Sequence, residues 1–170
     1  MDCAAIAMTT LGTISERRTY AMVNGDSGLP AFLTKSPGIN SGFMILQITA
    51  AALASENKSL STPSTIDSIP TGAGQEDHVS MAPWAGRKLY QIIENVTRIF
   101  GIECLTSLQA IDYRDNLKTG PALEIARNDI RLKVPLITSD RLMEDDLVFI
   151  EDYLKQGKLV GKVEGRLKLQ

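Results

Sequence analysis

The chain has 170 residues, enough for a domain with a hydrophobic core that needs no disulfide or metal to hold it together. Hydrophobic residues make up 44% of it, and 18 Lys and Arg against 20 Asp and Glu give a formal net charge of -2. This balance argues against a nucleic-acid-binding protein, which normally carries a basic excess or stripe. No apolar run approaches the roughly 20 residues that span a bilayer, and no secretory signal is visible. We therefore expect a soluble cytoplasmic protein without membrane contact.

Metal binding is also disfavoured by the composition. Two cysteines, Cys3 and Cys104, and the single His78 are too few ligands for a Cys/His zinc site, and no CxxC pair is present. We expect two reduced thiols and no metal.

The first half of the chain predicts two helices separated by a break. Residues 2–23 place Ile6 and Ile14 on spacings compatible with one helical face. A second helix, about 42–57, follows Asn40 and Ser41, whose side-chain oxygens suit a helix cap. This second helix is apolar nearly all round, so it must be buried. A lone domain of this size has little room to enclose it, and we expect the chain to need a partner.

The second half predicts a long loop and three further helices. Residues 59–74 are rich in Ser, Thr, Pro and Gly, and a loop of this length is usually functional or disordered. The longest helical pattern, about 83–113, predicts a rod of about 45 Å, which fits a bundle shared between subunits. Shorter helices are expected at about 121–134 and 143–156. The fold class is therefore all-α, a long-helix bundle, with 1–170 as a single helical segment.

The stretch from Gly72 to His78 is where the sequence indicates chemistry. Two glycines let backbone approach a ligand, and an amide, two carboxylates and an imidazole follow. A carboxylate in a partly enclosed loop can act as a general base when desolvation raises its pKa. The alternative is a helix N-terminus, where Glu76 and Asp77 would complement the dipole. A lone histidine is more often structural than catalytic, and Met44 is by default packing material.

A series of sequence blocks, taken in order, resembles the histidine ammonia-lyases of the aromatic amino acid ammonia-lyase family. These blocks are SERR at 15–18, GLPAFL at 28–33, NSGFM at 40–44, AAALASENK at 50–58, DSIPT at 67–71 and QEDHVSM at 75–81. The last is the most specific, because it is similar to the histidase version of a block that differs in the phenylalanine enzymes. Trp84 departs from the pattern, since similar histidases tend to have a smaller or imidazole side chain there.

The resemblance implies the C-terminal part of the ammonia-lyase fold, with long helices meeting in a homotetramer whose active sites draw on several subunits. It implies an enzyme that removes ammonia from L-histidine to give trans-urocanate. By this resemblance Glu76 matches the catalytic glutamate, Met44 matches a substrate-binding residue of the pocket, and the adjacent Gln75 is a further substrate-binding candidate. His78 belongs to the motif but receives no catalytic role.

The length is the main departure, because the resemblance covers only the last third of family members. Their electrophile, methylidene-imidazolone (MIO), forms from an internal Ala-Ser-Gly tripeptide, and this tripeptide does not occur here. The chain is therefore expected to be inactive without the missing N-terminal portion.

Two alternatives stay open. One is a fragment of a tyrosine or phenylalanine ammonia-lyase or aminomutase, which Glu76 disfavours because an anion suits an imidazole better than a phenyl ring. The other is a non-enzymatic helical module that self-associates.

Overall fold

The computed structural model describes residues 1–114 and 117–164, apart from the side chain of Ser27. This part of the chain is helical, as the hydrophobic spacing predicts. Its α-helices are α1 (Asp2–Val23), α2 (Met44–Leu60), α3 (Ala82–Asp112), α4 (Pro121–Arg131), α5 (Glu144–Lys155) and α6 (Lys158–Glu164). Short 3-10 turns lie at Asp26–Gly28, Ala31–Leu33 and Gly72–Gly74. None of the described helices is long and apolar enough to cross a membrane.

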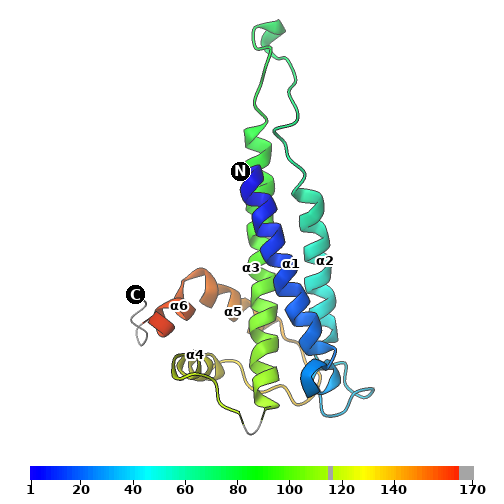
Figure 1. Cartoon of the computed structure of the whole chain (residues 1–170), viewed down its shortest axis with the longest axis vertical. Coiled ribbons are helices and arrows are strands. Elements are labelled where there is room, and N and C mark those ends of the chain that lie inside the picture. The colour runs from blue at the N-terminus through cyan, green and yellow to red at the C-terminus, as the bar shows by residue number, and fades with distance from the viewer. Residues whose placement is uncertain (115–116, 165–170) are drawn as a thin grey trace.

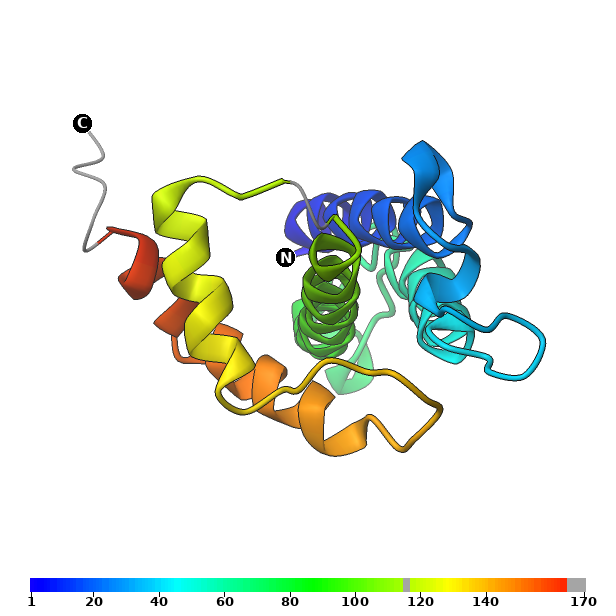
Figure 2. The same cartoon turned by 90° about the horizontal axis from the view of Figure 1, so that it is seen from below.

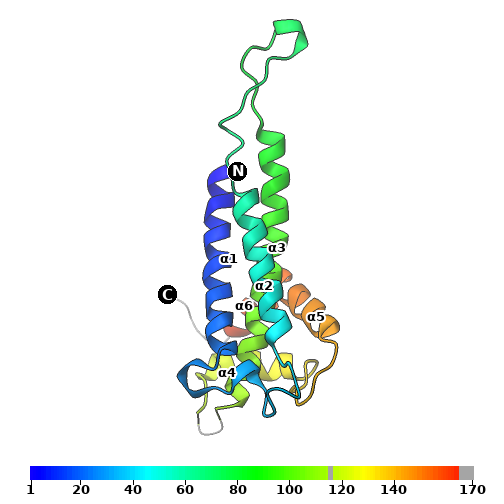
Figure 3. The ribbon, with the colours of Figure 1, turned by 90° about the vertical axis from the view of Figure 1, so that its right-hand side faces the viewer.

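Three long helices form the body of the molecule. α1, α2 and α3 run side by side along its long axis (Figure 1), and α1 packs against both of the others. The connection between α2 and α3 extends beyond one end of this bundle (Figure 3). At the other end, α4, α5 and α6 curve around one side of α3 (Figure 2), with α5 packed against α3 and α6 against α4. Of the predicted site residues, Met44 is at the start of α2, whereas Gln75 and Glu76 are in the connection that follows the other end of this helix.

α3 is the central element because its apolar stripe faces both groups of helices. The stripe is buried at the three- or four-residue spacing of one helical face, and it comprises Ile92, Val96, Ile99, Ile102 and Leu105. The helix covers 82–112 against the predicted 83–113, and Pro83 sits in its first turn, where a missing N–H costs nothing.

α1 faces its own chain with small and polar residues. Thr9, Gly12 and Ser15 are buried, and a Cβ added to Gly12 would lie 3.0 Å from Cγ2 of Val96 on α3. The two helices therefore pack closely. Ile6 and Ile14, on the expected apolar face, are 48% and 47% exposed. That apolar face points outward in the single chain.

α2 begins and ends later than predicted, at Met44 and Leu60 instead of about 42 and 57. The expected capping by Asn40 and Ser41 is not found, since no side chain caps the helix at its N-cap residue. The predicted complete burial is also not provided by this chain, because Ile45 and Ile48 are 57% and 51% exposed. The opposite face of the helix is buried in the core.

The C-terminal helices match the predictions except at their ends. α4 stops at 131, short of the predicted 134, and α5 spans 144–155 against the predicted 143–156. α6 is not predicted by the sequence, because a glycine such as Gly157, here left-handed with φ +66, is typical of a helix stop and the helix described after it has only seven residues. Asp129 of α4 secures α6 by accepting hydrogen bonds of 2.8 Å from both Tyr153 and Lys162.

Candidate functional site

The first group of predicted site residues lies on the tip loop, which we define as residues 71–78. Its two sides meet at Thr71 and Glu76, whose backbones exchange hydrogen bonds of 2.9 and 3.3 Å. The turn between them contains Gly72, Ala73 and Gly74, all with positive φ. The Thr71 hydroxyl also donates to Oε2 of Glu76 at 2.7 Å. The loop geometry therefore fixes one carboxylate oxygen of Glu76.

The tip loop is exposed throughout, including Gln75, Glu76, Asp77 and His78. It is distinct from the start of the following helix, because α3 begins only at Ala82 and has no acidic residue in its first turn. A helix dipole acts mainly within its terminal turn. Complementing this dipole is thus not an explanation for Glu76 and Asp77. The partial enclosure expected of a general base is not provided by this chain either, because residues 71–78 are exposed.

The base of the connection between α2 and α3 is held more firmly than its tip. The Asp2 carboxylate accepts the backbone N–H groups of Ser64 and Thr65 at 2.8 and 2.9 Å, which lowers the pKa of Asp2 despite the opposing effect of desolvation. Ser68 accepts a 2.8 Å hydrogen bond from the backbone of Val79. These contacts present the tip loop on a fixed stem, away from the rest of the described chain (Figure 1).

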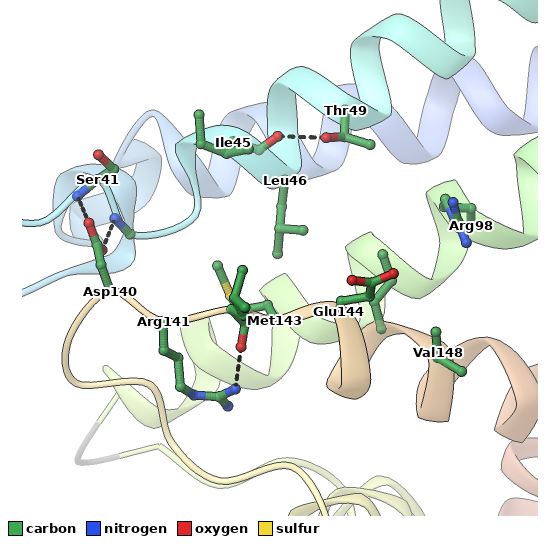
Figure 4. Close-up of a pocket in the computed structure, with 13 residues that line it drawn as sticks. Ser41, Ile45, Leu46, Thr49, Arg98, Asp140, Arg141, Met143, Glu144 and Val148 are labelled. Carbon is green, nitrogen blue, oxygen red and sulfur yellow. Dashed lines mark hydrogen bonds between the residues drawn. The ribbon is translucent and has the colours of Figure 1, made fainter.

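The second predicted site lies on what we call the Met44 turn, residues 40–44. Met44 is the first residue of α2 and is half-buried. A groove of about 660 Å³ lies beside this turn (Figure 4), and Met44 is not among the residues that line it. Its lining comes from the Met44 turn and the first half of α2, from α3, and from α5 with the segment before it. The lining residues are Ser41, Gly42, Ile45, Leu46, Thr49, Arg98, Asp140, Arg141, Leu142, Met143, Glu144, Leu147 and Val148.

Both arginines that line this groove are paired with carboxylates. Arg98 bonds Glu151 at 2.6 Å and Arg141 bonds Asp146 at 2.6 Å. The floor is apolar, formed by side chains of α2 and α5. The groove therefore offers shape and apolar contact, with both arginines neutralised by neighbouring carboxylates.

The single chain does not bring the two predicted groups together. Met44 begins α2, whereas Gln75 and Glu76 follow its other end, and 17 helical residues separate those ends by about 25 Å. In the described part of the chain, Glu76 and Gln75 are near each other and Met44 is remote from both. Clusters of three or more His, Cys, Asp or Glu that could hold a metal are absent from the residues described.

Asp140, which holds the Met44 turn, and Gln109, which links two segments near it, have no recognisable signal in the sequence. Asp140 accepts hydrogen bonds from the backbone N–H groups of Ser41 and Gly42, about a hundred residues away (Figure 4). Gln109 joins Leu33 to Ile137 from within the core. Since each acts on backbone groups of distant segments, no local motif marks it.

Comparison with known proteins gives a consistent result. The Aromatic amino acid lyase family matches residues 1–132. Histidine ammonia-lyase of Salmonella choleraesuis (strain SC-B67) is 48% identical over 159 residues, which are 93% of this chain and 31% of that protein. Among solved structures, histidine ammonia-lyase from Trypanosoma cruzi matches with a TM-score of 0.92 at 43% identity, over 96% of this chain and 32% of that one. Tyrosine aminomutase from Streptomyces globisporus matches with a TM-score of 0.94 at 32% identity, over 100% and 33%.

These relatives share the fold with the chain over nearly its whole length, and the chain spans about a third of theirs. The expected resemblance and the all-α fold, as part of the ammonia-lyase fold, are confirmed. The chain belongs to the aromatic amino acid lyase family.

Proposed function

We propose that this chain is the C-terminal part of a histidine ammonia-lyase, and that it contributes Glu76, Gln75 and Met44 to active sites shared between subunits. The substrate would be L-histidine and the products trans-urocanate and ammonia. The support from relatives is the higher identity to histidine ammonia-lyases, 48% and 43%, than to the tyrosine aminomutase, 32%.

The observation that carries the proposal is the separation of the two groups of predicted site residues. The tip loop with Gln75 and Glu76 is exposed, and within the described chain Met44 lies at the far end of α2 from it. In the proposed homotetramer, the tip loop of one subunit would lie at the Met44 turn of another. The exposed apolar side chains of Ile6, Ile14, Ile45 and Ile48 supply surfaces for such an assembly.

In this proposal Glu76 provides the anionic group of the site. Its Oε2 is engaged by Thr71, which orients the carboxylate and directs the other oxygen away from that hydroxyl. That oxygen would accept the imidazole N–H of histidine or the proton that leaves its β-carbon. As the proton leaves, the bond from the α-carbon to the amino group breaks, a carbon–carbon double bond forms, and ammonia departs. Met44 would border the imidazole pocket, and the Gln75 amide would offer a further hydrogen bond.

MIO, when bound in such an enzyme, supplies an electrophile that draws electrons from the substrate. Since these 170 residues contain no Ala-Ser-Gly, that group would have to come from a part of the enzyme outside them. The chain alone is therefore expected to self-associate through its apolar helices without showing lyase activity.

An aminomutase or tyrosine lyase is the second candidate. The tyrosine aminomutase has a TM-score of 0.94 over the whole chain, so the course of the backbone does not separate the two chemistries. The negative charge of Glu76 favours an imidazole over a phenol or phenyl ring. Faster turnover of tyrosine than of histidine, measured in competition, would reverse the assignment.

A direct test uses a chimera in which this chain replaces the matching last third of the Salmonella histidine ammonia-lyase. Addition of L-histidine should produce the absorbance of urocanate, and Glu76→Gln should reduce the rate by about a hundredfold or more. Asp77→Asn is the matched control, because it removes the neighbouring exposed charge and should leave most of the rate. A chimera that assembles with its MIO formed but shows no histidine-dependent signal would refute the proposal.

Subunit mixing tests whether the site is shared. Glu76→Gln and Met44→Lys chimeras, each inactive alone, are unfolded together in equal amounts and refolded. If the two residues of one site come from different subunits, about a quarter of the sites receive both intact residues, because each residue is intact in half of the subunits. Refolding that gives no active sites beyond the parent variants would place both residues in one subunit.

A further inference from the structure

The Met44 turn is held by a reciprocal contact with a segment about a hundred residues away. Oδ2 of Asp140 accepts the backbone N–H of Ser41 at 2.7 Å, and Oδ1 accepts that of Gly42 at 2.9 Å. In return, the backbone N–H of Asp140 donates to Oδ1 of Asn40 at 3.0 Å. Figure 4 shows the carboxylate directed at the turn from the loop before α5. Both oxygens of one carboxylate are therefore committed to two adjacent backbone groups.

A second contact fixes the same turn from its other side. The backbone N–H of Phe43 donates to the carbonyl of Phe32 at 2.9 Å. Gly42 has φ +53, and a Cβ on it would lie 2.2 Å from that carbonyl oxygen. Phe32 and Leu33 are themselves left-handed, with φ of 57 and 51. Such backbone persists only where the surroundings impose it, so the turn has little freedom to adjust if one contact is lost.

Gln109 keeps the two partner segments in register. Its Nε2 donates to the carbonyl of Ile137 at 2.7 Å and to that of Leu33 at 3.4 Å, and its Oε1 accepts the N–H of Ile137 at 3.2 Å. Ile137 lies three residues before Asp140, and Leu33 belongs to the strained segment that contacts Gly42. The loop that carries Asp140 is thus anchored relative to the turn on which it acts.

We infer that Asp140 is a positioning residue: its carboxylate fixes the backbone of residues 41–44 and so sets the direction of the Met44 side chain. The inference rests on the proposed function, in which Met44 borders the substrate pocket. A carboxylate suits the task because it has two equivalent acceptors for two N–H groups, and bonds to a charged acceptor are about twice as strong as neutral ones. Its negative charge also lies at the N-terminal end of α2, where it is favourable.

The side-chain chemistry predicts an order of effects. Asp140→Asn keeps the size but only one acceptor oxygen, and its NH2 group would face one of the two backbone N–H groups. Asp140→Ala removes both acceptors. Asp140→Glu retains two equivalent oxygens on a longer side chain, so it should restore part of what the other two variants lose. A residue needed only for bulk or solubility would not show this order.

The first measurement uses the chain itself, labelled with 15N and with 13C in its methionine methyl groups. In Asp140→Asn the amide signals of Ser41 and Gly42 and the methyl signal of Met44 should shift or broaden, while Asp140→Glu should stay closer to the original. Asp152→Asn, an exposed carboxylate on α5, is the matched control and should leave these signals unchanged. Unchanged Ser41, Gly42 and Met44 signals in Asp140→Asn would overturn the inference.

The second measurement uses the chimera with the Salmonella enzyme. Asp140→Asn should raise the KM for histidine about tenfold with a smaller change in kcat, Asp140→Glu should recover part of the loss, and Asp152→Asn should match the unmodified chimera. Signals that move while KM stays the same would overturn the functional role of Asp140. If the unmodified chimera lacks lyase activity, the proposed function fails, and the methyl and amide signals alone decide whether Asp140 positions the turn.

Discussion

Replacing Gln109 by leucine should destabilise the chain, because this side chain is the buried link between two loops. Gln109 is 1% exposed and serves both backbone groups of Ile137, at 2.7 and 3.2 Å. Leucine has a similar volume but no polar atoms. Each buried group left without a partner costs about 1–3 kcal/mol, so the two groups of Ile137 cost roughly 2–6 kcal/mol. The added apolar burial of leucine offsets about 1–2 kcal/mol of this.

With the middle of each range, the net loss in the free energy of unfolding is about 2.5 kcal/mol, equivalent to a fall in Tm of roughly 5–10 °C for a chain of this size. Urea unfolding followed by circular dichroism gives the urea concentration at the midpoint and the slope of the free energy of unfolding against urea concentration. Gln156→Leu at the exposed C-cap of α5 is the control and should change stability by less than about 0.5 kcal/mol. A Gln109→Leu variant that is as stable as this control, with an unchanged slope, would refute the view that Gln109 links the loops.

Two further predictions concern ionisable groups. Burial raises the pKa of Glu16, but hydrogen bonds from Arg17 and Gln47 outweigh this effect and leave the pKa below the ordinary 4.5. The ionised Glu16 therefore stabilises the fold above pH 4.5, and this stabilisation is lost as the pH falls through the lowered pKa. A Glu16→Gln variant should therefore show a flatter fall in Tm between about pH 5 and about pH 3; an equal fall in both would contradict this. Burial raises the pKa of Cys104 to about 11, so only about one thiol in a thousand is ionised at about pH 8. Iodoacetamide should add one group to the folded chain, at the exposed Cys3, and two after unfolding in urea, as counted by mass spectrometry; two rapid additions to the folded chain would contradict this.

The helices could be predicted from the sequence because their signals are local. The stripe of α3 repeats at three or four residues, Pro83 and Pro121 mark helix starts, and Gly157 marks a stop. α6 was missed because seven residues with Gly161 among them give too short a pattern to distinguish from a turn. The start of α2 was misplaced because the acceptor that holds the turn before it is Asp140, and spacing along the chain contains no information about such a partner.

The candidate site was predictable only as residue types. The motif at 75–81 points to Gln75 and Glu76, and the block at 40–44 points to Met44, but neither indicates that Met44 starts α2 while Gln75 and Glu76 lie beyond the other end of this helix, which is about 25 Å long. Their roles in catalysis and binding stay predictions, which the chimera and subunit-mixing experiments test. Thr71, which orients the Glu76 carboxylate, also needed the structure, because the contact depends on the left-handed backbone of the tip loop.

The distribution of polar and apolar side chains links the stability of the proposed assembly to the formation of its site. α1 turns Thr9, Ser15 and Thr19 inward and leaves Ile6 and Ile14 about half exposed, so the described part of this chain does not cover much of the apolar surface of α1. At about 25 cal/mol per Å² of apolar surface removed from water, covering such side chains favours association. If the same association brings a tip loop to a Met44 turn, burial and site formation occur together. Assembly would then complete the active site in the same step that covers the apolar faces of α1 and α2.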